Sequence, residues 1–223
     1  MRKMLAIIVI LAIIFISMVI YKNIRISNNE NNNVSIEEIG KIEEKIKSIY
    51  MWKEVTGEAL PEFQDINNAD EKWIWEVVKN NLQNYEVTYE EIEEEAKLIF
   101  GEKFNKQFSK EGNESFIYNS ETNKYIATEV ELDQEEDSFL LENIVKTESG
   151  YEVDILEYLE DYSQENSVVI KNINEEEIGR VGIDDSETKV QEIVKNNKDR
   201  FIKKKIYIKN ENNNLVIERV EKC

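Results

Sequence analysis

The segment LLENIVKTESGYEVDILEYLEDY (residues 140–162) is the clearest indicator of the fold. Two runs rich in Ile, Leu, Val and Tyr, residues 140–147 and 151–162, flank the pair Ser149-Gly150. Such residues favour strands, and a two-residue turn that contains glycine suits the twist of a β-hairpin. The segment therefore predicts a long antiparallel hairpin in the second half of the chain.

Other strand candidates surround this hairpin, separated by polar turns. They are residues 116–118, 125–130, 168–173, 180–183, 201–209 and 215–221, with turns at 119–123 and 210–214. Among them, Val190, Ile193 and Val194 have the spacing of one helix face. They predict a single late helix, for which Asp184 or Asp185 is the expected N-cap.

Three helices are expected before the strands, over residues 36–56, 71–82 and 89–100. The first and third begin with the S/T-x-x-E spacing of a capping box, at Ser35 and Thr88. The first helix also carries one apolar stripe: Ile36, Ile39, Ile42, Ile46 and Ile49. A coiled coil with a partner would show similar spacing, but packing against the protein's own sheet is the expectation.

Helices followed by hairpins are typical of an α+β architecture. We therefore expect about three helices packed on an antiparallel, hairpin-built sheet. Tryptophans 52, 73 and 75 lie in the helical part. Clustered aromatic side chains can bind sugars or peptides by stacking, but they more often belong to the core, which is the expectation here.

Residues 4–21 carry no charge and follow Arg2 and Lys3. As a helix this run would span roughly 27 Å, close to the apolar thickness of a bilayer, about 30 Å. We expect an uncleaved, single-pass transmembrane signal anchor in the cell membrane, with a cytoplasmic N-terminus and an extracytoplasmic C-terminal domain. A cleaved signal peptide and a buried core helix are the alternatives.

Composition divides the chain into three regions. Residues 1–25 form the basic tail and anchor, and residues 26–34 form an Asn-rich stalk. Residues 35–223 form an acidic soluble α+β domain, mainly helical over 35–110 and mainly strands over 111–223. With one proline and seven glycines in the chain, no linker divides this domain further.

Charge and residue usage exclude several classes of function. The chain has 28 Lys and Arg against 47 Asp and Glu, a formal net charge of −19, so nucleic acid is not an expected partner. The absence of histidine removes the commonest general base and metal ligand. Cys223 is the only cysteine, so an internal disulfide is impossible, and we expect a frayed, inert terminus rather than an intermolecular disulfide.

A cluster of carboxylates is the one candidate cation site, because carboxylate oxygens are the ligands that Ca²⁺ prefers. Its members are Asp133, Glu135, Glu136 and Asp137. An EF-hand loop needs Gly and Glu at its sixth and twelfth positions, where this sequence has Ser138 and Ile144. A solvated loop without a metal or cofactor is therefore the expectation.

Glycan hydrolysis is the enzymatic alternative, because it requires two carboxyl groups and no histidine. Acidic residues and tyrosines follow one another on the strand predicted over 151–162, where they could line a groove. They are Glu152, Asp154, Glu157, Glu160 and Asp161, with Tyr158 and Tyr162. An exposed strand face accounts for them equally well, so no catalytic residue is assigned.

Three segments carry a resemblance to known proteins: YEEIEEEAKLIFG (89–101), YNSETNKY (118–125) and ERVEK (218–222). With the succession of early helices, they are similar to exported, membrane-anchored proteins of AT-rich Gram-positive bacteria. The similarity covers most of residues 40–222 and implies no catalytic residue. The order of helices and sheet also resembles cystatin-like and NTF2-like folds, which host binding modules, scaffolds and some enzymes.

Together these observations predict a membrane-tethered, extracytoplasmic binding or scaffold module that is not an enzyme. Its expected partners are the membrane, through residues 4–21, and an envelope protein or peptide. A carboxylate-dependent cell-envelope glycan hydrolase and a weak divalent-cation binder are the alternatives.

Overall fold

The computed structural model describes residues 34–129, 134–185 and 187–223, and the elements below all lie in these ranges. Their architecture is α+β with antiparallel sheets, as the sequence predicts. The helices are α2 (Ile36–Ile49), α3 (Lys53–Thr56), α4 (Glu71–Asn81), α5 (Tyr89–Phe100) and α6 (Glu187–Asn196), with 3₁₀ turns η1 (Ile66–Asn68) and η2 (Lys198–Arg200). The strands are β1 (Glu86–Val87), β2 (Phe116–Asn119), β3 (Lys124–Ala127), β4 (Glu135–Lys146), β5 (Gly150–Gln164), β6 (Ser167–Lys171), β7 (Glu177–Gly182), β8 (Ile202–Glu211) and β9 (Asn214–Lys222).

In the part of the chain that the structure describes, no helix is both long and apolar enough to cross a membrane. The predicted anchor at residues 4–21 lies outside that part, as does most of the predicted stalk.

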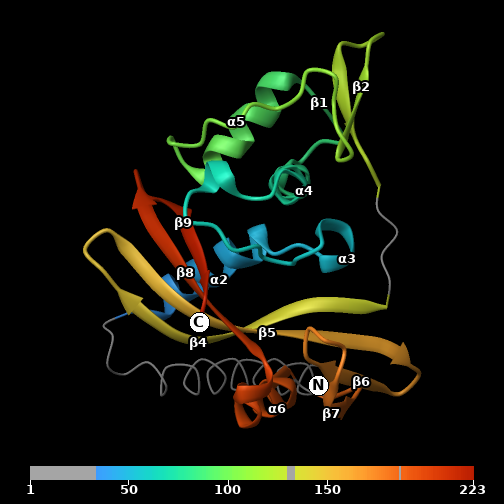
Figure 1. Cartoon of the computed structure of the whole chain (residues 1–223), viewed down its shortest axis with the longest axis vertical. Coiled ribbons are helices and arrows are strands. Elements are labelled where there is room, and N and C mark those ends of the chain that lie inside the picture. Colours follow the sequence, from blue (N-terminus) through green and yellow to red (C-terminus); the bar gives the residue numbers. More distant parts are fainter. Residues whose placement is uncertain (1–33, 130–133, 186) are drawn as a thin grey trace, which may run out of the picture.

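The β4–β5 hairpin predicted from residues 140–162 is the centre of a six-stranded sheet. Strand β5 pairs with β4 along one side. Along its other side β5 pairs first with β8, up to Glu157, and then with β6, from Leu159. The sheet therefore forks at Tyr158, and the pairs β8–β9 and β6–β7 diverge from there (Figure 1).

Helices cover both faces of this sheet. Helices α2, α4 and α5 pack on one face and share a core with β5, β8 and β9, in which Trp73, Ile155 and Ile206 are almost fully buried. Helix α6 packs on the opposite face, where Val194 joins Leu156 and Ile170 in a smaller core (Figure 1). We call the face covered by α2, α4 and α5 the inner face, and the face covered by α6 the outer face. The late helix thus adds a layer to the expected arrangement of helices on a sheet.

The hairpin β2–β3 forms a separate three-stranded sheet with the short strand β1. Its inner side is aromatic: Tyr125 packs edge-on against Phe108, and Phe108 packs edge-on against Trp75. Trp73 and Trp75 are less than 2% exposed, which agrees with the expectation of a core role. Trp52 is only half-buried and lies elsewhere, at the start of α3.

Both predicted capping boxes are present. Ser35 N donates to Glu38 Oε2 at 2.7 Å, and Glu38 N donates to Ser35 Oγ at 3.2 Å. Thr88 and Glu91 exchange the same two hydrogen bonds at 2.7 and 3.2 Å. These contacts satisfy backbone N–H groups that a helix start leaves without intrahelical partners.

Two differences from the predicted element boundaries affect the site described below. The first helix ends at Ile49 rather than before Gly57, because Met51 N leaves the helical pattern and donates to Ala59 O at 2.9 Å. Strand β4 begins at Glu135, so residues 135–137 pair with 159–161 of β5 and are not a solvated loop. Pairing with a long neighbouring strand has overridden the low strand propensity of an acidic run.

Candidate functional site

A cleft of about 570 Å³ follows the edge of the large sheet at the start of β4. Five consecutive residues of this strand line it, residues 136–140. Its walls come from the C-terminal half of α2, residues 50–52, the end of β5, the end of β7 and the first turns of α6. We call it the β4 cleft.

The backbone of β4 lies open along this cleft. Within residues 34–129, 134–185 and 187–223, β4 pairs with β5 alone. Tyr162 N donates to Gln134 O at 2.8 Å, so these two opposite residues form a hydrogen-bonded pair of the antiparallel ladder. Because bonded and outward-facing residues alternate, the N–H and C=O groups of Asp137 and Phe139 point away from β5. The cleft thus contains backbone donors and acceptors of an unpaired sheet edge.

Where the cleft borders the outer face of the sheet, it carries a pair of like charges. Glu136 on β4 lies directly opposite Glu160 on β5, so both side chains project from the same face. Desolvation, followed by the charge of Glu160, raises the pKa of the Glu136 carboxyl. Tyr162 donates its hydroxyl proton to Glu160 Oε2 at 2.7 Å. This corner is negatively charged and lies beside an aromatic ring.

Aromatic side chains form much of the remaining wall. Tyr50 and Phe139 pack together with ring centroids 5.1 Å apart, at the side of the cleft nearest α2. Trp52 is half-buried at the same end, and Tyr162 is 41% exposed at the other. A cleft that combines carboxylates with aromatic faces suits a ligand with cationic groups, by ion pairing and cation–π contact.

The acidic residues of β5 do not share one groove. Glu157 and Asp161 project from the inner face, whereas Glu152, Asp154 and Glu160 project from the outer face. Lysines neutralise most of them: Lys203 lies 3.3 Å from Asp154, Lys204 3.0 Å from Glu157, Lys205 3.5 Å from Glu152 and Lys171 2.7 Å from Asp161. Glu160 and Tyr162 line the β4 cleft together with Tyr158, while Glu157 lines a second cavity.

Strand alternation also separates the members of the candidate cation cluster. Asp133 lies outside the described residues, and Glu136 projects from the face opposite to Glu135 and Asp137. Asp137 Oδ2 accepts a hydrogen bond from Lys53 N at 2.7 Å. Among the residues that the structure describes, no three Asp, Glu, Cys or His side chains are arranged to hold a metal ion.

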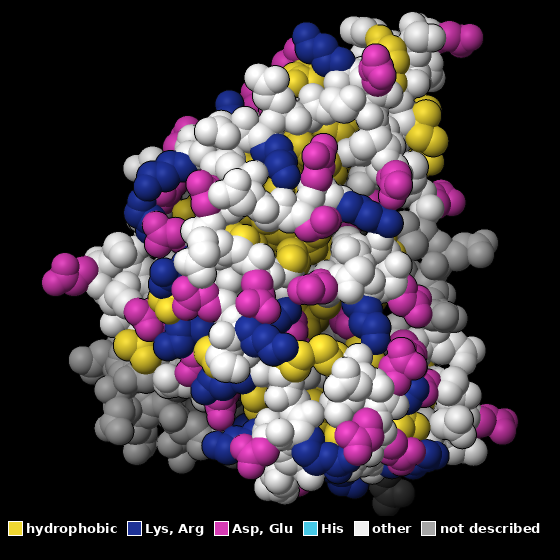
Figure 2. Space-filling model, in the orientation of Figure 1, with side chains coloured by type: hydrophobic (Ala, Val, Ile, Leu, Met, Phe, Trp, Pro, Cys, Tyr) yellow, Lys and Arg dark blue, Asp and Glu magenta, His cyan; other side chains and the backbone are white. Residues whose placement is uncertain are grey.

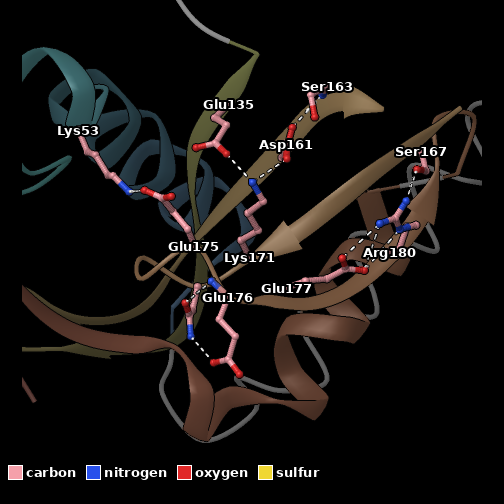
Figure 3. Close-up of polar contacts among 11 residues, drawn as sticks. Lys53, Glu135, Asp161, Ser163, Ser167, Lys171, Glu175, Glu176, Glu177 and Arg180 are labelled. Atoms are coloured by element: carbon pink, nitrogen blue, oxygen red, sulfur yellow. Dashed lines mark hydrogen bonds and ion pairs between the residues drawn. The ribbon is translucent and has the colours of Figure 1, made fainter. Parts of the chain in front are cut away.

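Glu135 instead belongs to an ion-paired cluster that closes the inner face of the sheet near its fork. Lys171 Nζ lies 2.6 Å from Glu135 and 2.7 Å from Asp161, between the two carboxylates (Figure 3). The hydrogen bond from Lys171 is the main reason that the pKa of Asp161 falls to about 2. Nearby, Lys53 lies 3.6 Å from Glu175 in the loop after β6 (Figure 3). These contacts join β4, β5, β6 and α3.

Over the view of the molecule in Figure 2, acidic and basic side chains are interspersed, and apolar side chains appear in small groups between them. The net negative charge therefore does not form one continuous field on this face.

Sequence reasoning did not place Lys47, Tyr50 and Trp52 in a common site, and of the three only Trp52 was considered, as one of the clustered tryptophans. All three fall in the stretch predicted as one continuous helix, and the early end of α2 is what turns Tyr50 toward β4. The one sequence signal for this early end of the helix is that the isoleucine stripe stops after Ile49. Comparison of the chain with protein-family models, curated proteins and solved structures yields no match, so the cleft has to be interpreted from its own geometry.

Proposed function

We propose that this protein is a binding module that captures an extended, basic peptide segment in the β4 cleft. The observation that carries this proposal is the open edge of β4 along the floor of a 570 Å³ cleft. In strand addition, an extended peptide pairs with a free sheet edge, and pockets beside the edge select alternate side chains.

The backbone supplies the first part of the interaction. The outward N–H and C=O groups of Asp137 and Phe139 would each exchange both hydrogen bonds with one residue of an added antiparallel strand, or bond to two different residues of a parallel one. Such bonds do not depend on the sequence of the peptide. They account for the binding of extended segments in general.

The side chains of the cleft supply the preference for positive charge. Six carboxylates line it, from Glu43, Glu136, Asp137, Glu160, Asp185 and Glu187; Lys47 pairs with Glu43 at 3.4 Å, and Lys189 pairs with Asp185. Glu136 and Glu160 repel each other, because like charges directly opposite on neighbouring strands are destabilising. A lysine or arginine side chain placed between them would relieve this repulsion, with Tyr162 beside its aliphatic stem.

In this proposal the module works at the outer surface of a membrane. Residues 4–21 anchor the chain, and the stalk at residues 26–34 holds the domain above the bilayer. The partner is then an extended basic segment of an envelope protein or a peptide. A negatively charged domain remains available for such a segment, because anionic headgroups repel it.

The test is fluorescence anisotropy with the full-length protein in detergent and a labelled ten-residue peptide of alternating Lys and Thr. We expect saturable binding that weakens at least tenfold for the double variant Glu136→Gln/Glu160→Gln. The matched control is Glu111→Gln/Glu121→Gln, which removes the same charge from exposed positions far from the cleft.

A second peptide separates strand addition from simple charge attraction. N-methylation of every residue removes the backbone donors on both edges of the peptide but keeps its charge. Binding should be lost with the methylated peptide if the β4 edge is the site. Equal affinity of both peptides, or equal loss in both double variants, would show that the proposal is wrong.

A further inference from the structure

A second cavity, of about 310 Å³, lies on the inner face where the sheet forks. Ile202 at the start of β8 and Ile173 just after β6 mark its two sides, and the segment of residues 50–62 covers it. Because β5 changes its partner at this point, no strand of the part of the chain that the structure describes pairs with Tyr158 on that side of β5. We call this space the fork cavity.

The wall of the fork cavity includes a buried ion pair. Glu157 is 4% exposed and Lys204 is 5% exposed. Glu157 Oε2 lies 3.0 Å from Lys204 Nζ, and this ammonium also donates to the carbonyl oxygen of Leu60. Burying two charges is unfavourable without good partners. This ion pair therefore lowers the stability that an apolar wall would give, and it keeps polar groups inside the protein. Desolvation raises the pKa of the Glu157 carboxyl.

The hydroxyl of Tyr50 adds a group that is only partly satisfied. Its oxygen lies 3.1 Å from Glu157 Oε1 and 3.2 Å from Ser138 O. Both acceptors compete for one proton, and both distances exceed the usual O–H···O separation of about 2.7–2.8 Å. The hydroxyl oxygen can also accept a hydrogen bond. A ligand hydroxyl beside Tyr50 would therefore find an acceptor in the Tyr50 oxygen.

We propose that the fork cavity is a second ligand site, which takes a small uncharged molecule with several hydroxyl groups, of the polyol or monosaccharide class. Its lining carries three lysines and four carboxylates, so an ion of either sign would meet repulsion as well as attraction. The volume corresponds to about ten water molecules at roughly 30 Å³ each, enough for a single sugar ring. Ile173 and Ile202 offer apolar surface for the C–H face of such a ring.

The test is ligand-observed NMR with the full-length protein and four probes: glycerol, myo-inositol, glucose and N-acetylglucosamine. We expect saturable binding of at least one probe in the millimolar range. Ile173→Trp should weaken it at least tenfold by filling the cavity. The matched control is Ile117→Trp, since Ile117 is 59% exposed on the small sheet and far from the cavity.

Two further variants keep the test decisive. Tyr50→Phe deletes only the hydroxyl and should weaken binding about threefold to tenfold, a result that stands even if Ile173→Trp fails to fold. Glu136→Gln/Glu160→Gln should leave probe binding unchanged, which separates this site from the β4 cleft. No saturation by any probe, or binding that survives both Ile173→Trp and Tyr50→Phe, would overturn the assignment.

Discussion

Glu136 and Glu160 face each other across the β4–β5 ladder, with their side chains on the same face of the sheet. Glu136 is exposed, yet partial desolvation and, after it, the charge of Glu160 raise the pKa of its carboxyl. A like-charged pair in this position costs stability, and lysine at one of the two sites would remove the cost. The pair is therefore a local weakness of the free protein at the place where the proposed ligand binds.

The first prediction concerns this pair. Glu136→Lys should raise the free energy of unfolding by about 0.5 kcal/mol, because an opposite-charge pair replaces a like-charge pair. The same change should weaken binding of the basic peptide. Urea denaturation and anisotropy measure the two effects. The control Glu148→Lys, an equal charge change in the exposed β4–β5 turn, should alter neither by as much.

The second prediction compares two glycines. At Gly150, an added Cβ would lie 2.0 Å from the carbonyl oxygen of Ile208 on β8, so the backbones must separate. Gly150→Ala should cost at least about 2 kcal/mol of stability. At Gly40, in the middle of α2, nothing lies within 4 Å of the added Cβ, so Gly40→Ala should stabilise by about 0.5–1 kcal/mol. Thermal and urea unfolding of both variants test this opposite response.

The elements that sequence reasoning located correctly are those whose signals are local. Capping boxes fix the starts of α2 and α5. The pair Ser149-Gly150 locates the central hairpin to within one residue: the turn is Glu148-Ser149, and Gly150 is the first residue of β5. These patterns act over a few residues, so they survive in a single sequence. The structure gives a further reason for a glycine at position 150, because the backbone of β8 approaches it closely.

The β4 cleft and the fork cavity could not be located in this way, because they depend on contacts between distant segments. Tyr50 meets Glu157 across 107 positions of the sequence, and Lys53 meets Asp137 across 84. The acidic run at 135–137 would suit a cation site only as a loop. Once β5 pairs with it, alternation sends neighbouring carboxylates to opposite faces.

The third prediction concerns Lys45 on α2. Its Nζ donates to Ile99 O at 2.8 Å in a partly buried position, and desolvation lowers its pKa to about 8. Between pH 8 and about 10.4 the unfolded chain then binds more protons at this site than the folded one, so stability rises with pH. The slope should approach about 1.4 kcal/mol per pH unit midway. Urea denaturation from pH 7 to 10.5 should show it, and Lys45→Met should remove it, while the exposed control Lys41→Met keeps it.

The fourth prediction concerns the acid side of the stability profile. Lys171 holds Asp161 at a pKa of about 2, below the ordinary value for aspartate. The folded protein therefore binds fewer protons than the unfolded chain between about pH 4 and pH 2, and its stability falls as the pH drops through this window. Lys171→Met should flatten the part of this fall that Asp161 causes, and it should also destabilise the protein at pH 7. An unchanged slope in acid titrations of the variant would contradict the assigned role of Lys171.

The last prediction concerns the buried pair Glu157 and Lys204. Lys204→Met leaves the Glu157 carboxylate without its ion partner, which should cost about 3 kcal/mol at pH 8. Because burial already raises the pKa of Glu157, its carboxyl can take up a proton in the variant as the pH falls. A carboxyl whose folded pKa is raised destabilises the protein increasingly as the pH rises above its unfolded value. The deficit of Lys204→Met should therefore shrink between pH 8 and pH 5, as measured by urea denaturation.

The double variant Glu157→Leu/Lys204→Met should recover most of the loss at pH 8, because it removes the unpaired charge along with its partner. A deficit that is independent of pH, or a double variant less stable than Lys204→Met, would mean that packing rather than charge explains the burial of this pair.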